Sequence, residues 1–266
     1  MVSFPPCKIN LGLQIINKRT DGFHNLATCF YPVPCTDILE IIPSQEVSLS
    51  ITGIDIPGDI NTNLCLKAYY LLQQDYNIPP VKIHLHKIIP TGAGLGGGSS
   101  DAAHTLRLLN TIFELQLSTQ KLFDYAAQLG SDCAFFIQDK PMIGTGRGEV
   151  LTESSVNLRG KFLVLVKPDV HVSTAEAYGG VTPAQPAIEL TEILSTSVSK
   201  WKNTLVNDFE SSVFNKHHII KQLKEELYTM GASYACMSGS GSSVFGIFEK
   251  EIVYKPDYLF SWSGFL

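Results

Sequence analysis

The spacing of hydrophobic residues predicts a chain in which strands and helices alternate. Val81, Ile83 and Leu85 alternate with polar residues, which is typical of a half-buried strand. The apolar residues of 63–74 and of 219–230 instead recur at helical spacing, and Gly231 ends the second of these segments. Because both halves of the chain show this alternation, we expect an α+β protein.

The same patterns predict the remaining elements and one domain boundary. Ser99, Ser100 and Asp101 open a helical pattern, and we expect them to cap that helix. Polarity and charge rise at 153–160, so we place the boundary between domains 1–155 and 156–266. Further strands are expected within 37–56, 162–166, 232–237 and 243–248, and a further helix over 118–130.

Composition and charge exclude several classes of protein. The 266 residues include 20 Lys and Arg against 25 Asp and Glu, a net charge of −5, so we expect no nucleic-acid partner. No apolar run approaches the length of a membrane-spanning helix, and the first residues do not resemble a leader peptide, so we expect no membrane association. The six scattered cysteines favour reduced thiols in a cytoplasmic protein.

The dominant candidate for chemistry is the glycine-rich stretch 90–100. It follows a predicted strand and precedes a predicted helix, where glycines let backbone N–H groups approach a phosphate. Gly98 stands where a P-loop needs lysine, and no strand with an acidic residue follows at the spacing of a dinucleotide-binding Rossmann unit. The protein-kinase motifs are absent as well. A flexible linker is the alternative reading, and the flanking elements disfavour it.

Other motifs carry less information when each is taken alone. Lys8 and Asn10 are two residues apart and would share one face of a strand. Asp132 precedes an apolar run and is either a cap or a functional carboxylate. The serine–glycine repeat 238–242 is either a tight turn or a second anion site. Lys8 alone could be an edge-strand lysine, and His24 a turn histidine.

Taken in order, these motifs resemble the GHMP kinase superfamily, from Pro6 to about Phe248. The matching patterns are P-x-K-I-N-L-x-L, D-G-F-H, P-x-G-A-G-L-G-G-G-S-S, L-G-S-D, G-x-G-E-V-L and S-G-S-G. They are most similar to the branch that phosphorylates the 2-hydroxyl of a cytidine-diphospho methylerythritol in the non-mevalonate route to isoprenoid precursors. The resemblance implies a two-domain α+β fold, with a ribosomal-protein-like N-terminal domain that binds ATP and a ferredoxin-like C-terminal domain.

The resemblance also implies roles for individual residues. Asp132 matches the catalytic aspartate and Lys8 the lysine beside it. Phe23 stands where the family commonly has tyrosine, which keeps the stacking ring. ATP binding is implied for Pro90, Thr91, Gly92, Ala93, Gly94, Leu95, Gly96, Gly97, Gly98, Ser99 and Ser100, and for Asn63, Leu64 and Lys87. Substrate binding is implied for Asn10, Phe23, His24, Thr174, Tyr178 and Gly239.

The expected cofactors are ATP and Mg²⁺, and the expected partner is a small-molecule substrate bound by a monomer or homodimer. The motifs mark no clear carboxylate ligand for magnesium, so Ser99, Ser100 and the oxygens of the nucleotide are the candidates. Three alternatives stay open: a kinase for another small alcohol such as homoserine or mevalonate, a non-enzymatic binder of a phosphate ligand, and a Rossmann dehydrogenase. The D-G-F-H motif, the pair Lys8 and Asp132, and the missing acidic strand disfavour them in that order.

Overall fold

The computed structural model describes residues 1–254 and 257–266. Within them the chain forms two compact units, each assembled from several segments, and the α+β class is confirmed. The sequence predicted a boundary at residue 155 between two successive domains. The two units are each built from separate segments of the chain, so they do not test that boundary, and it stays a prediction. The first unit comprises Met1–Cys7, Cys35–Thr91 and Gly96–Lys140, and the second comprises Lys8–Pro34, Gly92–Leu95 and Pro141–Leu266.

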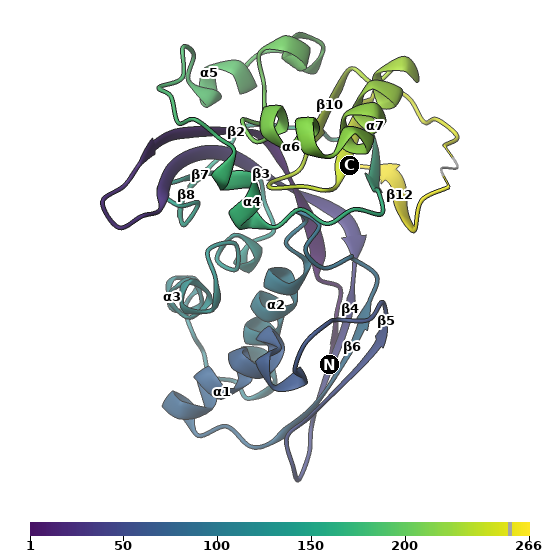
Figure 1. Ribbon diagram of the computed structural model, residues 1–266. Coiled ribbons are helices and arrows are strands. Elements are labelled where there is room, and N and C mark those ends of the chain that lie inside the picture. Colours follow the sequence, from purple (N-terminus) through teal and green to yellow (C-terminus); the bar gives the residue numbers. More distant parts are fainter. Residues whose placement is uncertain (255–256) are drawn as a thin grey trace. The chain divides into compact units, whose positions relative to one another are not determined.

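The first unit is a four-stranded sheet with helices packed on one face (Figure 1). The strands lie in the order β1-β4-β6-β5, in which only β5 and β6 are parallel. Its elements are β1 Val2–Ser3, β4 Ile38–Pro43, β5 Ser48–Gly53, η1 Ile60–Thr62, α1 Leu64–Tyr76, β6 Val81–Lys87, α2 Gly97–Ile112, α3 Thr119–Leu129 and η2 Phe135–Ile137.

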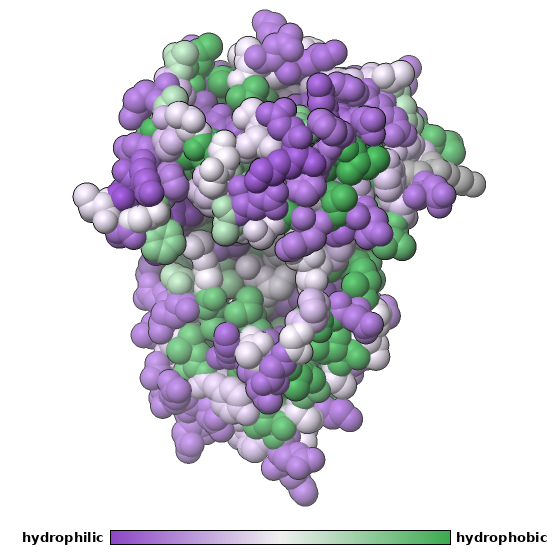
Figure 2. Space-filling model, in the orientation of Figure 1, coloured by the Kyte–Doolittle hydropathy of each residue, from purple (hydrophilic) through white to green (hydrophobic). Residues whose placement is uncertain are grey.

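Alternation of buried and exposed residues directs these strands as the sequence predicted. In β6 the residues Val81, Ile83 and Leu85 are fully buried, while the residues between them are partly or fully exposed. The helix α1 begins after Asn63, whose side chain accepts a hydrogen bond from the backbone of Cys65. In Figure 2 hydrophobic residues also stand at the surface of this unit around α1 and α2.

The second unit contributes most residues of two further four-stranded sheets, in the orders β2-β3-β7-β8 and β10-β11-β9-β12. The elements are β2 Pro6–Lys18, β3 His24–Thr36, β7 Met142–Thr145, β8 Val150–Glu153, β9 Phe162–Lys167, α4 Thr174–Gly179, α5 Leu190–Leu194, η3 Val198–Asn203, α6 Glu210–Lys216, α7 His218–Thr229, β10 Tyr234–Met237, β11 Val244–Phe248 and β12 Phe260–Phe265.

The core of the second unit lies around β9, which pairs with β11 on one side and β12 on the other. The helix α7 packs against β10 and β11 and buries Ile220, Leu223 and Leu227. Gly231 follows this helix with a φ of 97°, as expected for a helix-ending glycine. No helix within the described residues is long and apolar enough to cross a membrane.

Candidate active site

Lys8 is a buried lysine of β2 whose ammonium group is held by oxygen acceptors. Its side chain meets that of Asn10, as their spacing predicted: Nζ donates to Asn10 Oδ1 at 2.5 Å and to the Gly94 carbonyl at 2.9 Å. The centroid of the Phe30 ring lies 5.4 Å from Nζ. Because Lys8 is 3% exposed, these partners offset the loss of water around its charge. The result is a positive charge in a defined place.

The amide of Asn10 is oriented by a second hydrogen bond. Its Nδ2 donates to Thr28 Oγ1 at 2.9 Å, and the Thr28 hydroxyl donates to the Gly12 carbonyl at 2.6 Å. With its nitrogen engaged in this way, the amide turns its oxygen toward Lys8. Asn10 is 2% exposed, so the pair is fixed within the unit.

The glycine loop needs glycine because its backbone is left-handed and crowded. Gly92, Gly94 and Gly96 have φ values of 61°, 77° and 69°. A Cβ on Gly94 would lie 2.0 Å from the carbonyl oxygen of Ser238. Gly92–Leu95 belong to the second unit, whereas Pro90, Thr91 and Gly96–Ser100 belong to the first.

The expected cap of α2 was wrong. The helix begins at Gly97 rather than at Ser99, and its N-cap is Gly96, which makes no side-chain capping bond. Ser100 and Asp101 are instead buried within the helix. Gly96 has a left-handed backbone, which favours glycine there, and it has no side chain that could accept from the first N–H groups of the helix.

A pocket of about 360 Å³ lies in the first unit and collects five of the residues expected to bind ATP. They come from the start of α1, the end of β6 and the glycine loop. The segment 54–60 also lines the pocket, and its Ile54 and Ile60 are 38% and 45% exposed. The five expected residues are Asn63, Leu64, Lys87, Thr91 and Gly98.

Lys87, one of the residues that line this pocket, forms a buried triad with two carboxylates. Its Nζ bonds Asp37 and, at 2.8 Å, Asp101, while Asp37 also accepts from the backbone of Ile88 and Ile89 at 2.6 and 2.9 Å. Burial, and then the Asp37 carboxylate, raises the pKa of Asp101 to about 7 against the opposing effect of Lys87. Two carboxylates thus share one ammonium group. Sequence reasoning paired neither carboxylate with Lys87: it named Asp101 only as part of a cap, and Asp37 stands in no motif that indicates a lysine partner.

Asp132 lies in a half-buried turn between α3 and η2 of the first unit. The neighbouring Cys133 is fully buried, and its backbone N–H donates to the Gly130 carbonyl at 3.1 Å. Burial raises the pKa of the Cys133 thiol to about 11, which a hydrogen bond to Ser99 at the start of α2 partly opposes. Asp132 is therefore next to α2, while Lys8 belongs to the second unit, so the pairing of these two residues stays a prediction.

Aromatic residues expected to receive a base are partly assembled in the second unit. The rings of His24 and Tyr178 stack with centroids 5.0 Å apart, and the Phe209 ring meets Tyr178 edge-on at 4.8 Å. Phe23 is 54% exposed, and the guanidinium carbon of Arg147 lies 4.9 Å from its ring centroid. A sandwich of Phe23 and Tyr178 around a base therefore stays a prediction, and it needs the base to take the place of His24 on Tyr178 or to use the opposite face.

Arg147, which lies over the Phe23 ring, is a residue that sequence reasoning missed. It lies in the turn between β7 and β8, and the Gly146 carbonyl of that turn accepts from the backbone of Leu26 at 2.8 Å. An arginine within a glycine-rich turn was the only available signal. Thr174 begins α4, the short helix that also carries Tyr178.

Gly239 lies in the turn 238–242 between β10 and β11, beside Asn10. A Cβ on Gly239, whose φ is 55°, would lie 3.2 Å from Asn10 Oδ1. Ser238 Oγ donates to the Gly94 carbonyl at 2.9 Å. The turn, the glycine loop and β2 thus meet around the Gly94 carbonyl.

The described residues hold no group of three or more His, Cys, Asp or Glu side chains able to bind a metal ion. A magnesium ion held mainly by the phosphates of a nucleotide does not need such a group. Ser100 Oγ is buried without a hydrogen-bond partner at the start of α2, which fits a hydroxyl available to such an ion or to a phosphate. The residues present therefore fit a magnesium–nucleotide complex.

Comparison with known proteins gives two family matches. The model of the GHMP kinases N terminal domain matches residues 63–140, and that of the GHMP kinases C terminal matches residues 191–254. With the α+β fold, these matches define an ATP-dependent small-molecule kinase of the GHMP class. The mevalonate kinase of Methanococcus jannaschii shares this fold, with a TM-score of 0.67 over 93% of this chain and 90% of that chain at 16% identity.

Closer relatives narrow the class. A Cytophaga hutchinsonii protein is 53% identical over 94% of this chain and 93% of its own length, and one from Bacteroides fragilis is 53% identical over 97% and 96%. Both are named 4-diphosphocytidyl-2-C-methyl-D-erythritol kinase. A crystal structure of 4-(cytidine 5'-diphospho)-2C-methyl-D-erythritol kinase has a TM-score of 0.81 at 31% identity and covers 93% of this chain and 90% of that chain. The chain belongs to the 4-diphosphocytidyl-2-C-methyl-D-erythritol kinase family.

Proposed function

We propose that the protein transfers the γ-phosphate of ATP to the 2-hydroxyl of 4-diphosphocytidyl-2-C-methyl-D-erythritol, a step of the non-mevalonate route to isoprenoid precursors. The observation that carries this proposal is the 53% identity over 97% of the chain to a relative of that name. The D-G-F-H motif adds support, because it contains two residues proposed to bind a base, and a kinase for homoserine or mevalonate has no base to bind.

Asp132 is the proposed general base, which takes the proton of the acceptor hydroxyl as it attacks the γ-phosphorus. Lys8 is the proposed electrostatic partner, because a positive charge balances the charge that develops on the transferring phosphoryl group. The buried position of Lys8, with Asn10 and Gly94 as acceptors, supports this role. Most of the rate enhancement in phosphoryl transfer comes from such positioning and charge stabilisation.

ATP is proposed to bind with its phosphates along the loop 90–100 and its nucleoside end in the pocket lined by Asn63, Leu64 and Lys87. The N-terminus of α2 supports phosphate binding, because its first N–H groups have no partner within the helix. Ser99 or Ser100, together with phosphate oxygens, would hold a magnesium ion, which would supply neutralisation of the phosphate charge.

For the acceptor, Asn10 and Gly239 are proposed to hold the methylerythritol end, while Phe23, His24, Thr174 and Tyr178 receive the cytosine. Stacking on the rings and hydrogen bonds from His24 to the base edge would provide the specificity. The protein is proposed to act in the cytoplasm as a monomer or homodimer. Six free, buried thiols support a reducing compartment.

An acceptor panel tests this proposal. The protein is incubated with ATP, Mg²⁺ and one acceptor in each of three separate reactions. The acceptors are 4-diphosphocytidyl-2-C-methyl-D-erythritol, mevalonate and homoserine, and mass spectrometry measures the mass of each after the reaction. The expected result is one added phosphate on the cytidine-diphospho compound alone. Asp132→Asn is the matched control for contaminating kinases. Phosphate on mevalonate or homoserine at a higher rate would overturn the substrate assignment.

A further inference from the structure

The segment Val206–Asp208 binds along β2, the strand that carries Lys8 and Asn10. Leu13 N donates to the Val206 carbonyl, and Asp208 N donates to the Leu13 carbonyl, both at 2.9 Å. The side chain of Asp208 accepts from the backbone of Ile15 at 2.7 Å. Hydrogen bonds from both the backbone and a side chain therefore hold the segment on β2.

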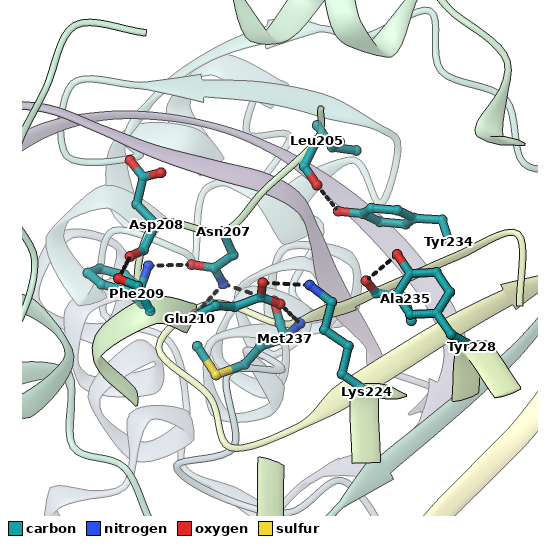
Figure 3. A network of polar contacts seen from close by, with 12 residues as sticks. Leu205, Asn207, Asp208, Phe209, Glu210, Lys224, Tyr228, Tyr234, Ala235 and Met237 are labelled. Carbon is teal, nitrogen blue, oxygen red and sulfur yellow. Dashed lines mark hydrogen bonds and ion pairs between the residues drawn. The ribbon is translucent and has the colours of Figure 1, made fainter. Parts of the chain in front are cut away.

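Asn207 in the middle of this segment uses its whole amide to hold another part of the unit (Figure 3). Its Nδ2 donates to the carbonyls of Met237 and Gly239 at 2.9 and 2.8 Å, and its Oδ1 accepts from Phe209 N at 3.0 Å. Asn207 is 2% exposed, so water does not compete for these bonds. Asn207 thus joins β2 to the turn 238–242.

Glu210 and Lys224 secure the strand that leads into this turn. Glu210 Oε1 accepts from Met237 N at 2.9 Å, and Glu210 Oε2 accepts from Lys224 Nζ at 2.6 Å (Figure 3). Burial by itself lowers the pKa of Lys224, but the Glu210 carboxylate outweighs it and raises that pKa. Lys224 therefore keeps its charge beside Glu210, and Met237 is held at both its N–H and its carbonyl.

The turn 238–242 contacts two of the groups that hold Lys8. Ser238 Oγ donates to the Gly94 carbonyl at 2.9 Å and accepts from Asn10 N at 3.3 Å. The same Gly94 carbonyl accepts from Lys8 Nζ. A displacement of the turn would therefore change the positions of two acceptors of the Lys8 ammonium group, Asn10 Oδ1 and the Gly94 carbonyl.

We propose that Asn207 is a positioning residue for phosphoryl transfer, which sets the place of Lys8 through the turn 238–242 and the Gly94 carbonyl. This inference rests on the proposed function, because it assumes that Lys8 acts in catalysis. Asn207 itself touches no reacting atom. Its removal is expected to affect the transition state more than the binding of either substrate.

Asn207→Asp tests the proposal, because the carboxylate keeps the shape of the side chain but directs an acceptor at two carbonyl oxygens. We expect kcat to fall roughly 10- to 100-fold, as for other displacements of about 1 Å near a reacting group, while both KM values change by less than about threefold. Tyr254→Phe is the matched control. It removes one hydrogen bond, to the Glu226 carboxylate at 3.0 Å, in the same unit but outside the contacts described above, and should keep the wild-type kcat.

Ser238→Ala supplies a second variant, which cuts the link to Gly94 while leaving Asn207 and its bonds in place. It should lower kcat by a similar factor, and the double variant should be no slower than the slower single variant. A wild-type kcat in Ser238→Ala, or in folded Asn207→Asp, would overturn the inference, and so would multiplicative effects in the double variant. Wild-type protein that fails to phosphorylate the cytidine-diphospho acceptor would instead overturn the proposed function.

Discussion

Replacing Gly94 by alanine tests how closely the glycine loop and the turn 238–242 depend on each other. The added Cβ would stand 2.0 Å from the Ser238 carbonyl oxygen, which is backbone and has no rotamer to change. The turn must then move away by about 1 Å to restore van der Waals contact. Gly160 provides a matched control in the same unit, since its φ of 83° is close to the 77° of Gly94 and no atom lies within 4 Å of its added Cβ.

The two substitutions share one cost and differ in the other. An alanine held in the left-handed region costs about 1–2 kcal/mol at either position. At Gly94 the movement also breaks the hydrogen bond from Ser238 Oγ and weakens the one from Lys8 Nζ. Such bonds contribute about 1 kcal/mol when neutral and about 1.5–3 kcal/mol when charged. We therefore expect Gly94→Ala to lose about 3–6 kcal/mol and Gly160→Ala about 1–2 kcal/mol.

Urea unfolding followed by circular dichroism measures both losses, and steady-state kinetics measures their consequence. Because Lys8 loses a defined acceptor, kcat of Gly94→Ala should fall roughly 100-fold, while Gly160→Ala should keep the wild-type value. Equal losses of stability in the two variants, together with an unchanged kcat in Gly94→Ala, would refute the reasoning that the loop and the turn form one support for Lys8.

Four further predictions concern the general base, the binding of the acceptor and the buried triad around Lys87. Asp132→Asn should lower turnover ~10²–10⁴-fold with ATP affinity unchanged by calorimetry, and near-normal turnover would contradict its role. Tyr178→Ala should weaken acceptor binding roughly 10- to 100-fold without changing ATP binding, and an equal loss for both ligands would point to misfolding instead. His24→Ala should lower the ratio of kcat/KM between cytidine and uridine acceptors, and an unchanged ratio would exclude it from base reading. Burial raises the pKa of Asp101 from 3.8 to about 7, so the folded state holds that proton more tightly than the unfolded chain does. This group's contribution to stability therefore falls as pH rises from about 4 to about 7. Asp101→Asn should remove this part of the pH dependence of the free energy of unfolding, measured by urea titration at several pH values. An identical pH dependence in the variant and the wild type would contradict the assignment.

Local patterns predicted those parts of the fold and site that depend on near neighbours. The alternation in β6 is visible within seven residues, and the shared face of Lys8 and Asn10 follows from strand geometry alone. The start of α2 was misplaced because its cap is Gly96, whose left-handed backbone leaves no polar residue to mark the position. A serine and an aspartate nearby suggested a cap that the helix does not use.

Partners that are distant in sequence could not be predicted from such patterns. Asp37 holds Lys87 from 50 residues away, and Asn207 holds Gly239 from 32 residues away. Each is an ordinary polar residue within its own segment, and only the tertiary fold buries it beside its partner. Arg147 is similar, since its contact with Phe23 joins two turns that lie far apart in the chain.

The position of the transferred phosphate tests the central claim most directly. In 4-diphosphocytidyl-2-C-methyl-D-erythritol carbon 2 carries the methyl group and the hydroxyl but no hydrogen. Phosphorus-31 NMR of the product should therefore show one new phosphomonoester resonance that no carbon-bound proton splits, in equal amount to the ADP formed. A new resonance split by neighbouring CH or CH₂ protons, or ADP formed without any new phosphomonoester, would contradict the account.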